Sequence, residues 1–215
     1  SAFYVFSEAV GAHVRKSDFA EVLGDGRALA ERNGGHEVDG RVVWVEGLPA
    51  PYQIGGPWRM TVDGKERSVT RLESWTEDAG TRHFSGTGIY DARFELPGAY
   101  VGTGMRLWLS LGEVGNVGEV ELNGRAAGVV WMRGQALEVT GLARAGANTI
   151  RVKVTNTLIN RAAGWTKAPP LAPELAAVYG RGVHDDDAQF RRLYGFGPLP
   201  RSGLLGPVVI TARKE

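Results

Sequence analysis

Glycine placement is the feature that most restricts how this chain can fold. The 31 glycines of the 215-residue sequence fall mostly between short runs of β-branched and aromatic residues. This spacing is typical of a sandwich or barrel of short strands, because each run is about one strand long and glycine suits the turns between strands. With 43% hydrophobic residues, the chain can build a sizeable core without a disulfide or a structural metal. We therefore expect an all-β domain.

Several of the predicted strands alternate cleanly between apolar and polar residues. Ile150, Val152 and Val154 alternate with polar residues, which predicts a strand with one face in the core. Asn123 and Gly124 both tolerate a positive φ, so they predict a type I′ hairpin turn. The predicted strands are Phe3–Phe6, Arg41–Glu46, Trp58–Val62, Gly88–Glu95, Met105–Leu111, Gly118–Leu122, Ala127–Trp131, Gln135–Val139, Thr149–Thr155 and Val208–Ala212.

Two segments depart from the strand pattern. Asp18–Arg32 predicts a short helix near the N-terminus, although Gly24 and Gly26 each weaken it by up to about 1 kcal/mol. Residues 165–203 are rich in Pro, Gly and Leu, which predicts one long excursion over the surface before the final strand.

Charge and cysteine usage exclude several classes of function. The formal net charge is +1, so the overall field gives no reason to expect a nucleic acid or an anionic membrane as partner. The chain has no cysteine, which excludes thiol catalysis and Cys-ligated zinc. No apolar run approaches the roughly 20 residues of a membrane helix, and the first residues lack the pattern of a signal peptide.

Several short motifs occur in an order that resembles one known family. From about Leu48 onward, the chain is similar to the C-terminal accessory domain of the family 106 α-L-rhamnosidases. One departure is Met132-Arg133-Gly134, where the family usually has a proline shortly after the position of Trp131. The motifs are Leu48-Pro49, Ile54-Gly-Gly-Pro-Trp58, Leu72-Glu-Ser-Trp-Thr76, Phe84-Ser-Gly-Thr-Gly-Ile-Tyr90, Leu109-Ser-Leu-Gly112, Val120-Glu-Leu-Asn-Gly124, Gly146-Ala-Asn148, Val154-Thr-Asn-Thr-Leu-Ile-Asn-Arg161 and Ser202-Gly-Leu-Leu-Gly-Pro-Val208.

This resemblance implies a fold, a partner and a location. The expected fold is a jelly-roll, galactose-binding-like β-sandwich over residues 47–215, and residues 1–46 would be an extension or the remainder of a preceding domain. The expected role is to brace the catalytic domain of the same precursor and to border its carbohydrate cleft. The expected location is the bacterial periplasm or the exterior, with the signal peptide outside this chain.

The chain offers one cluster of carboxylates for glycosidic cleavage. Such cleavage usually needs two carboxylates about 5 to 10 Å apart across a sugar-sized cleft. Trp75 is flanked by three carboxylates, Glu73, Glu77 and Asp78. We interpret them as surface residues of a turn beside a buried tryptophan. The resemblance places the catalytic acids in a separate barrel domain, so we expect no catalytic residue here.

We also expect no cofactor or metal. His184-Asp185-Asp186-Asp187 groups oxygen ligands that suit Ca²⁺, but three consecutive acids cannot all reach one ion, and the spacing matches no calcium loop. A solvated run of charge is the better interpretation. His13, His36 and His83 lack the spacing of a zinc site.

Five residues are candidates for contact with carbohydrate. Trp131 and Trp165 are the aromatic platforms of choice, although tryptophans of this kind more often belong to the core. Asn156, Asn160 and Arg161 carry groups that match sugar hydroxyls, and they serve equally well to hold the 165–203 excursion or to face a partner domain.

Two other functions stay open at this stage. An autonomous carbohydrate-binding module should present an exposed pair of aromatic side chains. A small hydrolase should bring two carboxylates together.

Overall fold

The protein is mostly β-structure, built from antiparallel sheets. The computed structural model describes residues 20–22, 28–38, 41–167, 172–179 and 197–214. Its strands are β1 (Ala20–Val22), β2 (Ala28–Ala30), β3 (Gly34–Val38), β4 (Arg41–Val45), β5 (Tyr52–Gln53), β6 (Trp58–Val62), β7 (Lys65–Val69), β8 (Thr87–Leu96), β9 (Met105–Ser110), β10 (Glu113–Gly115), β11 (Val117–Leu122), β12 (Arg125–Val130), β13 (Ala136–Glu138), β14 (Gly146–Thr155), β15 (Gly203–Gly206) and β16 (Val209–Lys214). The helices are α1 (Ile159–Ala163) and α2 (Pro173–Tyr179), with short 3₁₀ turns at Trp75–Glu77 and Gly98–Tyr100.

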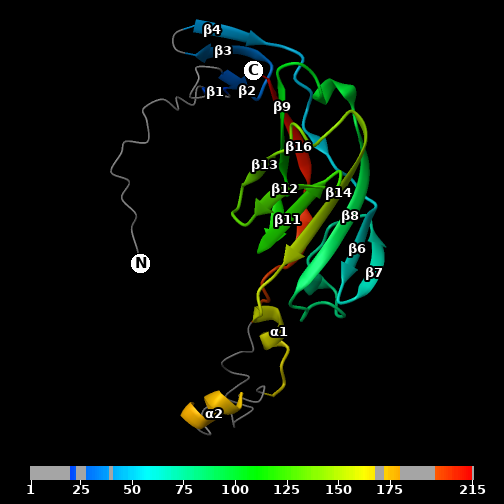
Figure 1. The fold of residues 1–215 in the computed structure, drawn as a ribbon, viewed down its shortest axis with the longest axis vertical. Coiled ribbons are helices and arrows are strands. Elements are labelled where there is room, and N and C mark those ends of the chain that lie inside the picture. The colour runs from blue at the N-terminus through cyan, green and yellow to red at the C-terminus, as the bar shows by residue number, and fades with distance from the viewer. Residues whose placement is uncertain (1–19, 23–27, 39–40, 168–171, 180–196, 215) are drawn as a thin grey trace, which may run out of the picture.

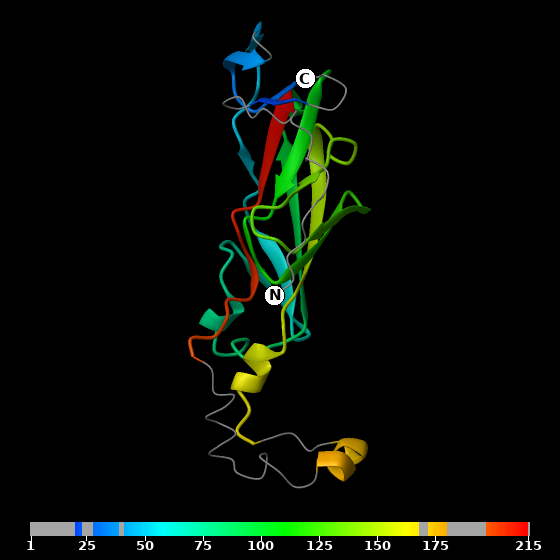
Figure 2. The same cartoon turned by 90° about the vertical axis from the view of Figure 1, so that its left-hand side faces the viewer.

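Two large sheets form the body of the molecule (Figure 1). The front sheet has the strand order β12-β11-β14-β8-β6-β7, and all of its neighbouring strands are antiparallel. The back sheet has the order β1-β2-β16-β9-β13, with β5 also paired to β16. In a view turned by 90°, the molecule is narrow and elongated (Figure 2). The long strands of the body run along its length, and α1 and α2 lie at one end. The prediction of an all-β fold is confirmed in its coarse form.

One continuous core lies between the two sheets. Ile150, Val152 and Val154 are all at most 1% exposed, which confirms the face predicted from their alternation. The back sheet contributes Leu107, Leu109 and Ile210 to the same cluster, again almost fully buried. Burying such side chains supplies about 1.5–3 kcal/mol each, so the sheets hold each other in place.

The last strand is an interior element of the back sheet. β16 pairs with β9 over six residues and also with β5 at Tyr52 and Gln53. The predicted strand Val208–Ala212 therefore pairs inside the back sheet. β15, the strand just before β16, forms a separate two-stranded sheet with β10.

Most predicted strands lie close to their observed positions. β6 matches its predicted bounds, and β8, β9, β11, β12, β13, β14 and β16 lie within three residues of theirs. The turn between β11 and β12 has positive φ at Asn123 (52°) and Gly124 (76°), as the hairpin prediction requires. The predicted strand Phe3–Phe6 lies outside the described residues.

The predicted helix over Asp18–Arg32 is wrong where the structure describes it. Ala20–Val22 and Ala28–Ala30 are antiparallel strands, paired with each other. β2 also pairs with the end of β16, and Leu29 is 1% exposed. Sheet pairing and burial of Leu29 therefore override a helical propensity that Gly24 and Gly26 already weaken. The boundary near residue 46 stays a prediction.

The 165–203 excursion is described only in part. Helix α2 lies beyond α1, away from the two sheets (Figure 1). Val178 on that helix is 74% exposed. Much of the rest of the excursion, including His184–Asp187, falls outside the described residues. In the part of the chain that the structure covers, no helix is long and apolar enough to cross a membrane.

Candidate functional site

Trp131 lies at the surface, beside a hollow of about 380 Å³. Its side chain is 64% exposed, so the expectation that it more often belongs to the core is wrong for this residue. The pocket is lined by Gly112, Glu113, Val114, Asn116, Trp131, Met132 and Arg133. An exposed indole face next to carboxylate, amide and guanidinium groups is the chemistry that binds a sugar ring and its hydroxyls.

Gln135 holds the turn that presents Trp131. Its Oε1 accepts hydrogen bonds from the backbone N–H groups of Trp131 (3.1 Å) and Met132 (3.3 Å). Its Nε2 donates to the carbonyl oxygen of Val129 at 3.0 Å. The Met132-Arg133-Gly134 sequence therefore forms a closed turn, and Gly134 supplies the positive φ (77°) that the turn needs.

The opposite wall of the pocket comes from β10 and the residue that follows it. Glu113 forms an ion pair with Arg201 at 2.6 Å. Asn116 has a positive φ (89°), and its Oδ1 accepts a hydrogen bond from the backbone N–H of Thr157 at 3.3 Å. These contacts join the pocket to Arg201 and Thr157, the neighbours in sequence of Ser202 and Asn156.

Asn156 and Asn160 belong to an internal network centred on Ser202. Ser202 is 1% exposed, and its Oγ accepts hydrogen bonds from Nδ2 of Asn156 (3.1 Å) and Nδ2 of Asn160 (2.9 Å). Asn156 also donates to the carbonyl oxygen of Phe84, and Asn160 donates to that of Pro200. Of the two roles left open by the sequence, the structure shows these amides holding residues 200–202 against the body.

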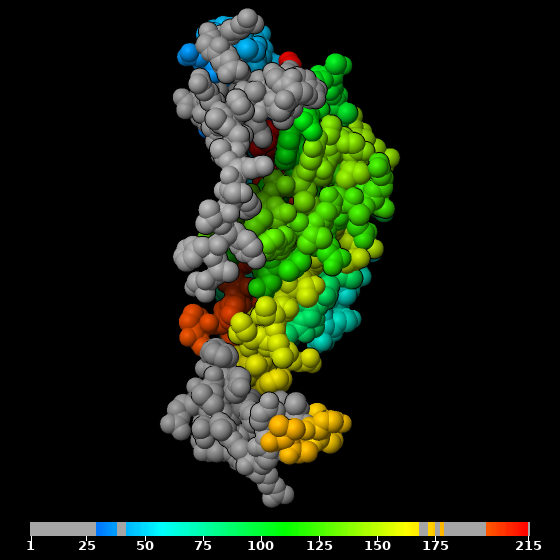
Figure 3. Space-filling model, turned by 60° about the vertical axis from the view of Figure 1, so that its left-hand side comes forward, coloured from blue at the N-terminus to red at the C-terminus, as the bar shows by residue number. Residues whose placement is uncertain are grey.

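The backbone around Ser202 completes the junction. The Ser202 N–H donates to Ser74 Oγ at 3.0 Å, and the Trp75 N–H donates to the Ser202 carbonyl oxygen at 2.9 Å. The space-filling view shows the orange-red residues after 197 packed against the yellow segment that carries α1 (Figure 3). Ser202 is thus a buried structural residue.

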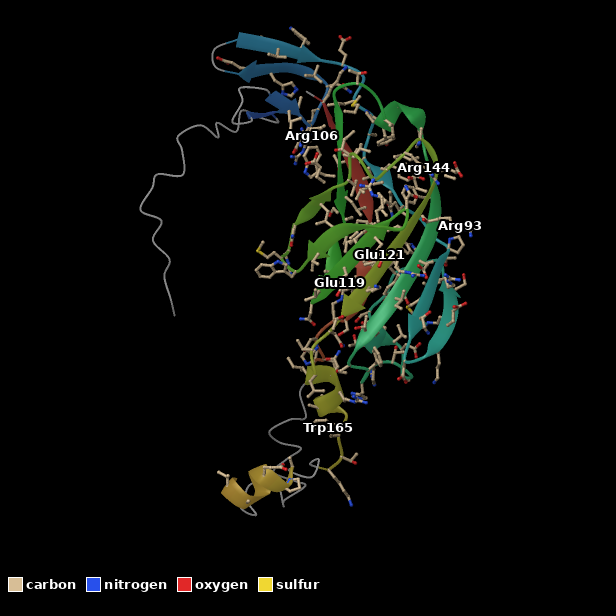
Figure 4. The ribbon with its side chains drawn as sticks, viewed as in Figure 1. Arg93, Arg106, Glu119, Glu121, Arg144 and Trp165 are labelled. Atoms are coloured by element: carbon tan, nitrogen blue, oxygen red, sulfur yellow. The ribbon has the colours of Figure 1, made fainter. Side chains whose placement is uncertain are left out.

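The remaining two predicted residues, Arg161 and Trp165, do not line the Trp131 pocket. Arg161 has an exposed side chain on α1, and its backbone N–H donates to Ser85 Oγ at 3.1 Å. Trp165 is half-buried just after α1, below the sheets (Figure 4). Of the five predicted residues, only Trp131 lines the pocket.

Two of the carboxylates near Trp75 are paired with arginines. Trp75 is 1% exposed, which confirms that it is a buried tryptophan beside a turn. Oε1 of Glu73 forms an ion pair with Nη2 of Arg71 at 3.6 Å. Asp78 forms an ion pair with Arg67, whose hydrogen bond, together with one from the Gly80 N–H, holds the pKa of Asp78 below its ordinary value.

Asp91 and Glu121 are a second pair that the sequence did not suggest. Both line one cleft on the outer face of the front sheet. Burial raises the pKa of Asp91, but hydrogen bonds and charge from Arg151 and Arg59 outweigh it and keep the pKa low. Glu121 is ion-paired to Lys153 at 3.1 Å. Asp91 therefore stays ionised at neutral pH and is not the proton donor that glycosidic cleavage needs.

A metal ion would need several His, Asp or Glu side chains close together. Among the described residues, no group of three or more His, Asp or Glu side chains is placed to hold a metal ion. His83 instead contacts the carbonyl oxygen of Asn160 through Nδ1 at 3.0 Å.

The fold is shared with domain-sized parts of larger glycoside hydrolases. The rhamnosidase from Novosphingobium sp. PP1Y matches 83% of this chain with 26% sequence identity and a TM-score of 0.59. The β-glucuronidase from Bifidobacterium dentium matches 79% of the chain with 18% identity and a TM-score of 0.52, which shows likeness of fold alone. The chain spans only 16% of the rhamnosidase and 31% of that β-glucuronidase.

Sequence comparison gives a consistent result over a shorter range. A putative β-glucuronidase from Formosa agariphila is 33% identical over 132 residues, which is 58% of this chain and 11% of that protein. No protein-family model matches the chain. The chain is therefore similar to a small part of glycoside hydrolases of the rhamnosidase and β-glucuronidase type.

Proposed function

We propose that this chain is a non-catalytic accessory domain of an α-L-rhamnosidase-like glycoside hydrolase. In this role it braces the catalytic domain of the same precursor and contacts carbohydrate at the Trp131 pocket. The proposed location is the bacterial periplasm or the exterior. The proposal rests mainly on the likeness to the Novosphingobium rhamnosidase, which extends over most of this chain but only 16% of the other.

The geometry of the pocket supports binding rather than cleavage. Glu113 is the one carboxylate among the described residues that line it, and that carboxylate is held by Arg201. Hydrolysis by the usual route needs a second carboxyl group across the cleft. The exposed indole of Trp131 instead provides an apolar surface on which the C–H face of a sugar ring can stack.

Two assays test the proposal together. The purified 215-residue chain should release no aryl alcohol from an aryl α-L-rhamnoside. Titration with L-rhamnose should perturb the NMR signal of the Trp131 indole N–H, assigned by its loss in Trp131→Phe. Measurable turnover by the isolated chain would contradict the non-catalytic role, and an unperturbed Trp131 signal at saturating rhamnose would contradict the binding role.

The second candidate is an autonomous carbohydrate-binding module. The exposure of Trp131 favours it, but such a module is expected to present a pair of aromatic side chains. The other strongly exposed tryptophan among the described residues is Trp44, at 73%, and it lies on the β3–β4 hairpin at the far end of the molecule (Figure 1). The two do not form a joint platform, so the accessory role is the better supported.

A further inference from the structure

A larger hollow than the Trp131 pocket lies on the outer face of the front sheet. It has a volume of about 570 Å³, within the range of small-molecule sites, and it crosses β6, β8, β14 and β11. Figure 4 shows Arg93 on β8 and Glu121 on β11, both on this sheet. The charged side chains that line the cleft are Arg59, Asp91, Arg93, Glu121 and Arg151.

Most of these charges are neutralised within a single row across the sheet. The strand register places Asp91 between Arg59 and Arg151. Arg59 Nη2 lies 3.0 Å from Asp91 Oδ2, and Arg151 Nε lies 2.7 Å from Asp91 Oδ1. One carboxylate therefore serves two guanidinium groups. The other lining carboxylate, Glu121, is held by Lys153.

Arg93 has no such partner. It lies two residues beyond Asp91 on the same face of β8, opposite Thr149 on β14. No described residue forms an ion pair with it, although Glu95 follows two residues later on the same face, outside the cleft. Gly124 lines the cleft without a side chain and leaves space beside Thr149.

We propose that this cleft binds a carboxylate-bearing sugar, a uronate, with its carboxylate on Arg93. A guanidinium group binds a carboxylate through two parallel hydrogen bonds, and such charge-assisted bonds are about twice as strong as neutral ones. The Thr149 hydroxyl and the Asp91–Arg151 pair supply donors and acceptors for ring hydroxyls. No aromatic side chain of the described residues lines the cleft, so charge supplies the affinity.

The test is an NMR titration of the ¹⁵N-labelled chain with glucuronate and, in parallel, with glucose. These sugars differ only in the carboxylate. Glucuronate should perturb backbone amides of β8 and β14 around Arg93 and Thr149, and glucose should bind about tenfold more weakly or worse. Arg93→Gln should lose a similar factor for glucuronate. The matched control is Arg106→Gln, on β9 of the back sheet, which should bind like the wild type.

Each remaining outcome bears on a separate part of the proposal. Equal binding of glucose and glucuronate, or unchanged binding by Arg93→Gln, would overturn it. Acetate that binds as tightly as glucuronate would overturn the assignment to a sugar, and tighter binding of glucose 6-sulfate would overturn the assignment to a carboxylate. This site shares no lining residue with the Trp131 pocket, so it is independent of the proposed function. Trp131→Ala should therefore leave the glucuronate titration unchanged.

Discussion

Replacing Ser202 with alanine should destabilise the domain more than the loss of one hydroxyl suggests. The Ser202 hydroxyl accepts one N–H from Asn156 and one from Asn160, and each amide keeps only its second N–H bond when the hydroxyl is removed. A buried donor left without a partner costs about 1–3 kcal/mol. Asn160 is 2% exposed and Asn156 is half-buried, so we assign about 2 and about 1 kcal/mol to them.

The expected total is therefore about 3 kcal/mol, which lowers the melting temperature by about 6–12 °C for a chain of this size. Urea unfolding followed by tryptophan fluorescence measures the loss, and the slope with denaturant should not change. Ser85→Ala is the control, because Ser85 Oγ accepts one N–H, from Arg161, at the surface. That change should cost less than about 1 kcal/mol. Equal losses in the two variants would refute the view that the Ser202 network holds the end of the excursion.

Three further predictions concern the candidate sites and the core. Trp131→Ala should abolish the shifts that L-rhamnose causes in the backbone amides that line the pocket. It should change the free energy of unfolding by less than about 0.5 kcal/mol, because the side chain is 64% exposed, and a large loss of stability in urea would contradict this. Gly203→Ala should prevent folding or lower the melting temperature sharply, because the φ of Gly203 is +96° and an added Cβ would lie 2.6 Å from Trp75 Nε1. The control is Gly124→Ala, where φ is +76° and the added Cβ would meet open space. In the same melt, that change should lower the free energy of unfolding by only about 1 kcal/mol. The pKa of Asp91 is lower in the folded than in the unfolded chain, so its ionised form stabilises the fold above the ordinary carboxyl value of 3.8. The wild-type advantage over Asp91→Asn should therefore shrink as the pH falls from that value through the folded pKa, and an advantage that does not shrink on acidification would contradict the assignment.

The sequence predicts the central strands well because their alternation is strong. β6, β8 and β14 each bury every second residue, and period-two burial is the signal that a single sequence carries best. β7 was missed because four of its five residues are exposed and it shows no alternation. Its turn did carry a signal, since Asp63 and Gly64 have the positive φ of a tight hairpin and an Asp-Gly pair predicts one.

The sites depend on information that residue types alone do not contain. Asp91 meets Arg59 and Arg151 only through the register of three strands, and a shift of any one strand by one residue would move its member of the row to the other face. Asn160 reaches Ser202 across 42 residues of sequence. The sequence singles out these asparagines, but it does not show the hydrogen bonds that join Asn156 and Asn160 to Ser202.

The size of the native polypeptide tests the central claim most directly. An antibody raised against this chain can be used to detect the protein in cells of its source organism, and the account predicts a species several times larger than 23.1 kDa. That species should hydrolyse an aryl α-L-rhamnoside after immunopurification. A native species of about 23 kDa that carries no such activity would contradict the assignment of this chain as an accessory domain of a larger hydrolase.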